Sequence, residues 1–170
     1  MALAFVHLIG AWLFTKGYEF LSRTKINKEM WFCLLLGAIL PDIDYLIDWT
    51  LGTGIHRTFT HSLWVVIAVL FAYLVFKILK DQKKESYTAA LGLGIVIHLL
   101  IDFFSAQGIP LLWPSGIYFS IKGLGVYNPA ISLLKGSPTF LFKKLKLAIF
   151  DMGLGTVWIF YLWLRGRVKF

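Results

Sequence analysis

Charged side chains are scarce in this chain. Only 15% of its 170 residues are Asp, Glu, Lys or Arg, whereas 58% are hydrophobic and the mean hydropathy is +0.74. In a soluble domain roughly a quarter of the residues are charged, so this composition excludes an ordinary soluble protein. We expect an integral membrane protein in which residues 1–170 form a single membrane-embedded domain.

Cysteine and the common catalytic motifs are also rare or absent. Cys33 is the one cysteine and lies in an apolar run, which excludes an intramolecular disulfide and favours a buried, unreactive thiol. No basic region precedes the first apolar stretch, so we do not expect a cleaved signal peptide. The chain has no glycine-rich nucleotide loop and no G-x-S-x-G sequence. It also lacks H-E-x-x-H, which argues against a zincin-type intramembrane protease.

Long apolar runs dominate what is present. A bilayer-spanning helix needs roughly 20 apolar residues; four runs qualify, and an earlier, shorter one is marginal. The predicted fold class is therefore all-α, a polytopic membrane helical bundle of about five segments, at residues 2–15, 30–49, 62–79, 88–106 and 147–164. Residues 107–146 are rich in Gly, Pro and aromatic side chains, which disfavours a regular span. We expect this stretch to be a long irregular loop before the last segment, acting as a lid or re-entrant loop at the membrane interface.

The net charge of +8 arises from basic residues that gather near the ends of these segments. If the five segments alternate in direction, the richest clusters share one side; they lie at 16–28, 77–84 and 165–169. Because positive residues accumulate on the cytoplasmic side of membrane proteins, we expect an extracytoplasmic N-terminus and a cytoplasmic C-terminus. Anionic lipid accounts for the basic charge, and we expect no nucleic-acid partner.

Histidine and aspartate form one constellation within the apolar runs. His98 and Asp102 are four residues apart, so they share a face of a predicted helix. The expected topology places every member at one depth, on the outer side: His7, Asp42, Asp44, His56, His61, His98 and Asp102. Ionisable groups near a bilayer are costly and are usually kept for an ion, a proton or a substrate. Because His with Asp suits a divalent metal, we predict one site with one or two ions, most favourably zinc.

The acidic run after Pro41 allows two geometries. Proline disfavours a continuing helix, and an extended backbone would point Asp42 and Asp44 the same way. If the backbone stays helical, Asp44 pairs with Asp48 instead. The plain alternative is a helix end with solvated acids. For His98 and Asp102 the plain alternative is a buried hydrogen bond that locks two helices together.

The segment between His56 and His61 suits a loop that enters a helix, with Thr60 as the candidate N-cap. Arg57 beside metal ligands could hold a phosphate through two parallel hydrogen bonds. Its alternative role is a lipid-headgroup anchor. We assign Arg57, Thr60 and Ser62 to substrate binding.

Three motifs together resemble a known family. They are GAILPDID at 37–44, HRTFTHS at 56–62, and HLLIDFF at 98–104 followed by LWP at 112–114. In this order they resemble the YdjM-type inner-membrane metal-dependent hydrolases, over about residues 1–120. The resemblance implies a small, multi-pass protein of a prokaryotic inner membrane with metal-dependent hydrolase activity.

A more remote resemblance is to the zinc-dependent phospholipase C and P1 nuclease group, whose multi-zinc site cleaves phosphoesters. Asp42 and His56 have that group's fourteen-residue spacing, His98 begins its H-x-x-x-D pair, and His7 resembles its early histidine. The group's N-terminal tryptophan ligand and its later His and Glu ligands are missing here. One or two metals is therefore the better expectation, with Asp44 and His61 supplying part of what is lost.

These observations lead to three functional hypotheses. The first is a hydrolase that cleaves a phosphoester of a lipid or lipid-linked substrate at the extracytoplasmic face. Asp44 would take the proton of the attacking water, and Arg57 would neutralise charge on the phosphate. The second is a metal-ion transporter, although residues 93–97, LGIVI, offer an ion no polar path. The third is a structural-metal or partner-binding membrane protein, although more ligands are present than the four that a structural zinc needs.

Overall fold

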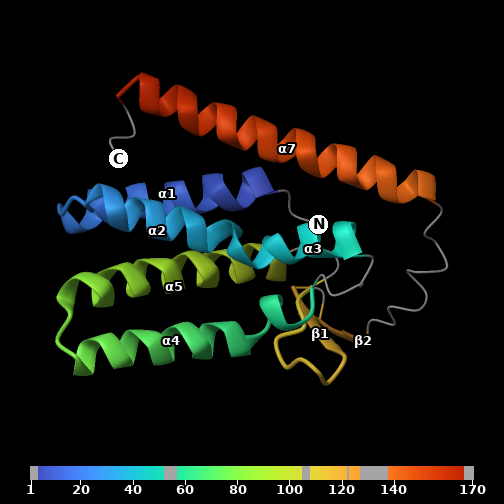
Figure 1. Ribbon diagram of the computed structural model, residues 1–170, viewed down its shortest axis with the longest axis horizontal. Coiled ribbons are helices and arrows are strands. Elements are labelled where there is room, and N and C mark those ends of the chain that lie inside the picture. The colour runs from blue at the N-terminus through green and yellow to red at the C-terminus, as the bar shows by residue number, and fades with distance from the viewer. Residues whose placement is uncertain (1–3, 52–56, 105–107, 122, 127–137, 167–170) are drawn as a thin grey trace.

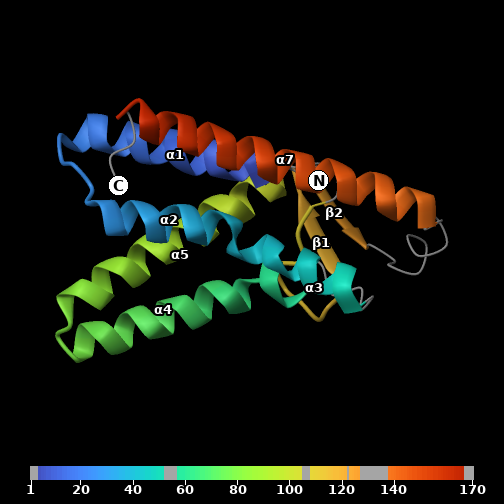
Figure 2. The same ribbon diagram turned by 45° about the horizontal axis from the view of Figure 1, so that its top comes forward.

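The computed structural model describes residues 4–51, 57–104, 108–121, 123–126 and 138–166. Its long helices lie side by side and alternate in direction (Figures 1 and 2): α1 (Ala4–Ser22), α2 (Lys28–Ile39), α4 (Leu63–Ile78), α5 (Gln82–Phe103) and α7 (Pro138–Leu164). Shorter elements gather at one end of this bundle: η1 (Leu40–Ile43), α3 (Asp44–Leu51), η2 (Phe59–His61), β1 (Ile117–Ser120) and β2 (Gly123–Val126).

Side-chain caps fix where three of the helices begin. Asn27 accepts from the backbone N–H of Met30 at the start of α2, and Asp81 accepts from that of Lys84 at the start of α5. The Lys84 N–H holds the pKa of the Asp81 carboxyl below its usual range. At α4 the cap is Ser62, whose hydroxyl accepts from the Trp64 N–H. The prediction of Thr60 as N-cap is therefore wrong by two residues, because residues 59–61 form a separate 3-10 turn.

Helices α2 and α5 approach closely because each has a glycine at the contact. A Cβ added to Gly94 would lie 2.1 Å from the Leu34 carbonyl oxygen, and one added to Gly37 would lie 2.1 Å from that of Leu91. Small residues allow helix backbones to approach in this way. Leu34 and Ala38 are buried beside this contact. The spacing of these two backbones positions the functional site described below.

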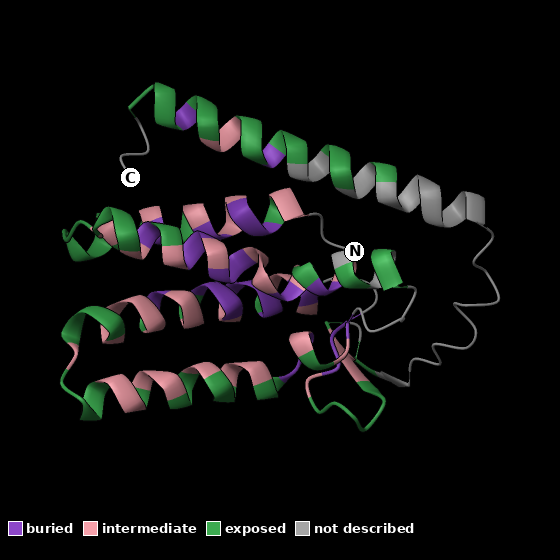
Figure 3. Ribbon diagram, viewed as in Figure 1, coloured by how far each residue is buried: buried purple, intermediate pink, exposed green. Residues whose placement is uncertain are grey.

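Buried residues gather where α1, α2 and α5 face one another, whereas α4 has no buried residue (Figure 3). In the part of the chain that the structure describes, Gln82–Phe103 is the one helix long and apolar enough to cross a bilayer. Leu63–Ile78 and Gly153–Leu164 are shorter apolar helices. The mostly helical fold is as predicted, but five membrane-spanning helices are not confirmed.

The stretch 107–146 is more regular than its composition suggests. Strands β1 and β2 pair antiparallel, with Ile117 opposite Val126, and a bridge joins Ile109 to Phe119. Helix α7 begins at Pro138, nine residues before the apolar run at 147, and proline is well tolerated at the first helical position. The prediction of an irregular loop is therefore wrong for residues 117–120, 123–126 and 138–146.

Candidate metal centre

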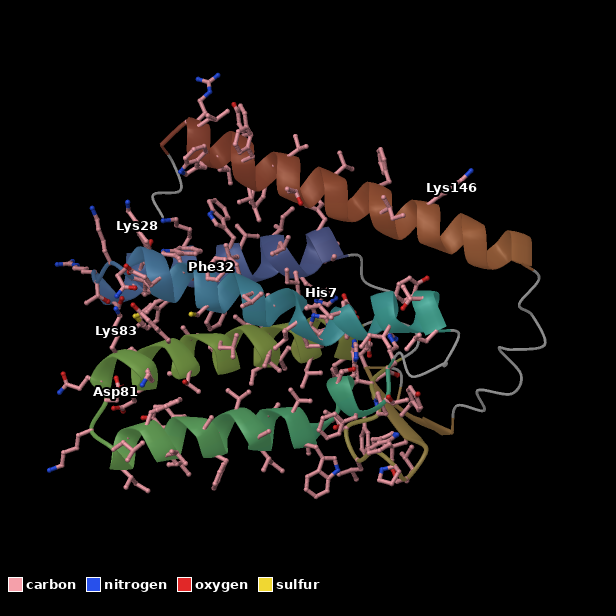
Figure 4. The ribbon with its side chains drawn as sticks, in the orientation of Figure 1. His7, Lys28, Phe32, Asp81, Lys83 and Lys146 are labelled. Carbon is pink, nitrogen blue, oxygen red and sulfur yellow. The ribbon has the colours of Figure 1, made fainter. Side chains whose placement is uncertain are left out.

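The predicted ligands meet at the end of the bundle where the short elements lie. His7 comes from α1, Asp42 from η1 and His61 from the end of η2, while His98 and Asp102 come from the last turns of α5. Figure 4 shows His7 beside these elements, with Lys28, Asp81 and Lys83 at the opposite end of the bundle. Four segments that are distant in sequence thus contribute to one cluster. His56, also predicted as a ligand, lies outside the described residues, as does the side chain of Asp48.

Nitrogen and carboxylate oxygen atoms converge within this cluster. His61 Nε2 lies 3.3 Å from Asp42 Oδ1 and 3.6 Å from Asp102 Oδ2. His98 Nε2 lies 3.7 Å from Asp42 Oδ1, and His7 Nε2 lies 3.5 Å from Asp102 Oδ1. The His7 ring stacks on the His98 ring with their centroids 3.8 Å apart. These separations exceed the roughly 2.7–2.9 Å of a charge-assisted hydrogen bond.

The protonation of His98 follows from its backbone partner. His98 Nδ1 lies 2.7 Å from the carbonyl oxygen of Ala38. A carbonyl only accepts hydrogen bonds, so Nδ1 must carry the proton. In the neutral ring, Nε2 then presents a lone pair to the cluster. Metal-binding histidines commonly donate their other ring nitrogen in this way.

His61 has the same orientation for a different reason. The Thr60 hydroxyl makes a short hydrogen bond to the Asp44 carboxylate and lies 3.0 Å from His61 Nδ1. An ionised carboxylate only accepts, so Thr60 donates its proton to Asp44 and accepts one from His61 Nδ1. In the neutral ring, His61 Nε2 then also presents a lone pair to the cluster, 3.2 Å from Nε2 of His98.

Burial makes this arrangement costly unless a cation is present. His7, His61 and His98 are fully buried, and Asp102 is 1% exposed. With neutral imidazoles, the three carboxylates of Asp42, Asp44 and Asp102 and the one guanidinium of Arg57 leave a formal charge of −2. Buried net charge is strongly unfavourable. Among the residues that the structure describes, none is a hydrogen-bond partner for either buried ring nitrogen of His7 or for the buried Oδ1 of Asp102.

The donor set fits a divalent metal ion. Two groups of three have ligand atoms within 4.8 Å of one another: His7, Asp42 and His98, and His61, His98 and Asp102. Ligands about 2.0–2.2 Å from a tetrahedral ion are themselves about 3.3–3.6 Å apart, close to the separations observed. The two groups share His98, whose one available nitrogen can serve a single ion.

Asp44 lies outside both groups. Its Oδ2 accepts from Thr60 and from the backbone N–H of Arg57, and it is 3.6 Å from His61 Nδ1. Asp42 and Asp44 therefore approach opposite nitrogens of the His61 ring. The backbone after Pro41 is not extended, because η1 is a 3-10 turn that continues into α3. Asp42 and Asp44 nevertheless both reach the His61 ring. The structure places Asp44 where it orients His61.

Arg57 is directed into the cluster. Its guanidinium donates to Asp102 Oδ2 at 2.8 Å and to the Gly108 carbonyl at 3.0 Å, and the residue is only 6% exposed. The backbone of Arg57 is left-handed, with φ of 59°, a conformation that non-glycine residues rarely adopt. Tyr118 in β1 donates to the Arg57 carbonyl. These contacts favour a role inside the site over the alternative of a surface headgroup anchor.

The other residues assigned to substrate binding have local partners. The Thr60 hydroxyl bonds Asp44 and His61, and the buried Ser62 hydroxyl donates to the Phe59 carbonyl while capping α4. Sequence reasoning missed Tyr118 and the Ala38 carbonyl. Backbone carbonyls leave no mark in a sequence, and the Tyr118 contact depends on where the hairpin packs.

Comparison with known proteins identifies a family for this chain. The family model described as YdjM inner membrane protein matches residues 1–167, which extends well beyond the motifs at 37–114. Inner membrane protein YdjM of Escherichia coli (strain K12) is 31% identical over 121 residues, which cover 60% of this chain and 59% of that protein. Uncharacterized protein YvsG of Bacillus subtilis (strain 168) is 34% identical over 83 residues, 48% of this chain and 46% of that protein. The chain thus spans about half to three-fifths of these relatives. No solved structure matches it.

Proposed function

This chain belongs to the YdjM inner membrane protein family, and we propose that it is a membrane-embedded, metal-dependent hydrolase of a lipid or lipid-linked phosphoester. The observation that carries the proposal is the convergence of two imidazole lone pairs, from His61 and His98, with the carboxylates of Asp42 and Asp102. A family of inner membrane proteins makes a membrane lipid the natural substrate.

The residues that would hold the metal are His7, Asp42, His61, His98 and Asp102. Mixed imidazole and carboxylate donors suit zinc, and the shared His98 favours one ion over two. A divalent ion, when bound, supplies Lewis-acid polarisation of a phosphoryl oxygen and acidifies water.

The remaining groups have roles that follow from their contacts. Asp42 is the exposed member of the cluster, with 23% of its side chain accessible, so a substrate would approach along its side. Arg57 places a fixed positive charge beside Asp102, where it would stabilise charge that develops on a phosphoryl group. Asp44, through Thr60, holds His61 in one tautomer and is the carboxylate able to accept a proton on that side.

A structural metal is the second candidate, and the near-complete burial of His7, His61, His98 and Asp102 favours it. One experiment separates the two. We expect protein purified in lipid nanodiscs to carry about one divalent ion per chain and to release phosphate or a phosphorylated headgroup from a panel of phospholipids and isoprenyl phosphates. A chelator should abolish this activity and zinc should restore it. If the metal-loaded protein cleaves none of the panel but unfolds on chelation, the metal is structural.

Arg57 provides a sharper test of phosphoester chemistry. We expect Arg57→Ala to lower turnover by about 10²–10³, equivalent to about 3–4 kcal/mol, because one preorganised charge contact is lost. Arg57→Lys should restore only part of this rate, since lysine keeps the charge but not the planar fork that reaches both Asp102 and Gly108. Rates should be compared at equal metal content, with circular dichroism as the check on folding. Unchanged turnover in Arg57→Ala would remove this residue from the mechanism.

The cluster is proposed to face the extracytoplasmic side, because the basic groups at 16–28 and 77–84, together with Arg165, lie at the other end of the bundle. In a Cys33→Ser background, we expect Ser115→Cys to react with a membrane-impermeant maleimide on intact cells. Gln82→Cys should react only after permeabilisation. Both positions are exposed and lie at opposite ends of the chain's fold. The opposite labelling pattern would place the cluster on the cytoplasmic side.

A further inference from the structure

An open apolar groove lies next to the metal centre. It has a volume of about 490 Å³, within the usual range of small-molecule sites. One wall is the first turns of α4 and the other is the loop that precedes β1. The lining residues are Leu63, Trp64, Ile67, Leu111, Leu112, Trp113, Pro114 and Ser115.

Both walls of the groove lead directly from the cluster. On one wall, Leu63 follows His61 and Ser62 in the chain. On the other, Leu111 lies three residues beyond Gly108, whose carbonyl accepts from Arg57. The backbone N–H of Leu63 donates to the Leu111 carbonyl at 3.0 Å and joins the two walls. Along both segments of the chain, the groove therefore begins within three residues of a group that belongs to or contacts the cluster.

The far end of the groove opens onto the apolar exterior of α4. Ile67, Leu70 and Leu74 are 51%, 53% and 45% exposed, and this helix has no buried residue. Trp64 and Trp113 flank the opening, as tryptophan commonly does at membrane interfaces. The groove thus lies between a polar, buried centre and a surface suited to hydrocarbon.

The polar groups of the lining already have partners. Trp64 Nε1 donates to the Trp113 carbonyl at 2.8 Å, and the Ser115 hydroxyl accepts from the Ile117 N–H. A peptide segment in the groove would bring backbone N–H and C=O groups that these side chains leave unsatisfied, at a high cost. A hydrocarbon chain brings no such groups.

We propose that this groove binds the hydrocarbon chain of the lipid whose phosphate lies at the metal centre. The inference rests on the proposed function and extends it, because it makes the substrate a long-chain lipid phosphoester and assigns the chain a fixed position. It also gives residues 111–115 the role of one wall of the chain-binding site.

The test uses hexadecyl phosphate with a diazirine near the middle of its chain, in nanodiscs of dioleoyl phosphatidylcholine that contain the protein. After photolysis, we expect mass spectrometry to find labels on residues 63–67 and 111–115. Excess unlabelled hexadecyl phosphate should suppress these labels, whereas excess butyl phosphate should not. Labels around Leu74, on the general lipid-facing surface, should be unaffected by either competitor.

Two matched variants add bulk to the exposed face of α4. Ile67→Trp fills the groove, and Leu74→Trp adds the same side chain seven residues further on, outside it. Ile67→Trp should weaken competition by hexadecyl phosphate about tenfold, since excluding about two methylenes from an apolar site has roughly that effect. In Leu74→Trp, unlabelled hexadecyl phosphate should compete as well as it does in the wild type. Equal metal content in both variants checks folding.

The outcomes separate the groove from the hydrolase. Competed labels in the groove support chain binding even if the lipid panel shows no cleavage, in which case only the hydrolase proposal is overturned. The chain-binding proposal is overturned if labels spread evenly along α4, or if hexadecyl phosphate competes equally in Ile67→Trp and Leu74→Trp. Neither outcome contradicts the hydrolase proposal.

Discussion

His98→Ala is expected to abolish turnover and to lower metal affinity by at least about 100-fold, because it removes the nitrogen that both ligand groups share. Even the loss of an outer hydrogen-bond partner of a metal ligand typically costs 10–100-fold. Metal content of the purified protein, measured by mass spectrometry, reports the loss independently of activity. Asp102→Ala should lose metal too, since its oxygens face His7 and His61.

A second substitution at the same position separates metal binding from helix packing. The side-chain N–H of His98→Asn can still donate to the Ala38 carbonyl, as Nδ1 of His98 does, but nothing replaces Nε2. We expect this variant to fold like the wild type and still lack metal. If His98→Asn retains a full complement of metal, His98 is a helix-locking residue and the metal centre as described is wrong.

Gly94→Ala is expected to be the most destabilising single-methyl change in α5, at about 3 kcal/mol, near the upper end of typical overpacking costs. Its Cβ would lie 2.1 Å from the Leu34 carbonyl and 2.9 Å from the backbone nitrogen of Ala38. Backbone atoms cannot move aside as a flexible side chain can, so α2 and α5 must separate. Thermal unfolding in nanodiscs measures the effect.

The matched control is Gly92→Ala, two residues away on the same helix. There the added Cβ would meet only a methyl group of Val69 at 3.1 Å, and alanine is the better helix former. This variant should unfold near the wild-type temperature. Equal stability of the two variants would show that α2 and α5 do not pack as closely as the glycines indicate. Gly94→Ala should also lose metal, because separating the helices withdraws Ala38 from His98.

The sequence predicts which residues meet at the site better than it predicts how they are arranged. His98 and Asp102 share a face of α5 because four residues make about one helical turn. His7, Asp42 and His61 lie with them because alternating helices bring those ends together, at one end of the bundle. Neither expectation required knowledge of side-chain contacts.

The arrangement itself depends on short turns with weak sequence signals. The position of Asp44 behind His61 follows from the 3-10 turn at Pro41, and the separate 3-10 turn at 59–61 moves the cap of α4 to Ser62. Strand β1 was not predicted, because its four residues lie in a stretch rich in glycine and proline. The composition of the whole stretch indicated a loop, although these four residues form a strand. Its contact through Tyr118 with Arg57 spans 61 residues and could not be read from local sequence.

The partly exposed carboxylate of Asp42 has a consequence for the time scale on which the proposed metal would exchange. The other ligands of the cluster are almost completely buried, whereas Asp42 lies on η1, between the end of α2 and the short helix α3. If the proposed metal is bound, an ion that leaves would pass this corner, and we expect its residence time to follow the opening rate of η1 and α3 and not only its affinity. A cell in which zinc becomes scarce would then retain loaded protein until these short helices open, and loss of function would lag behind the fall in free metal.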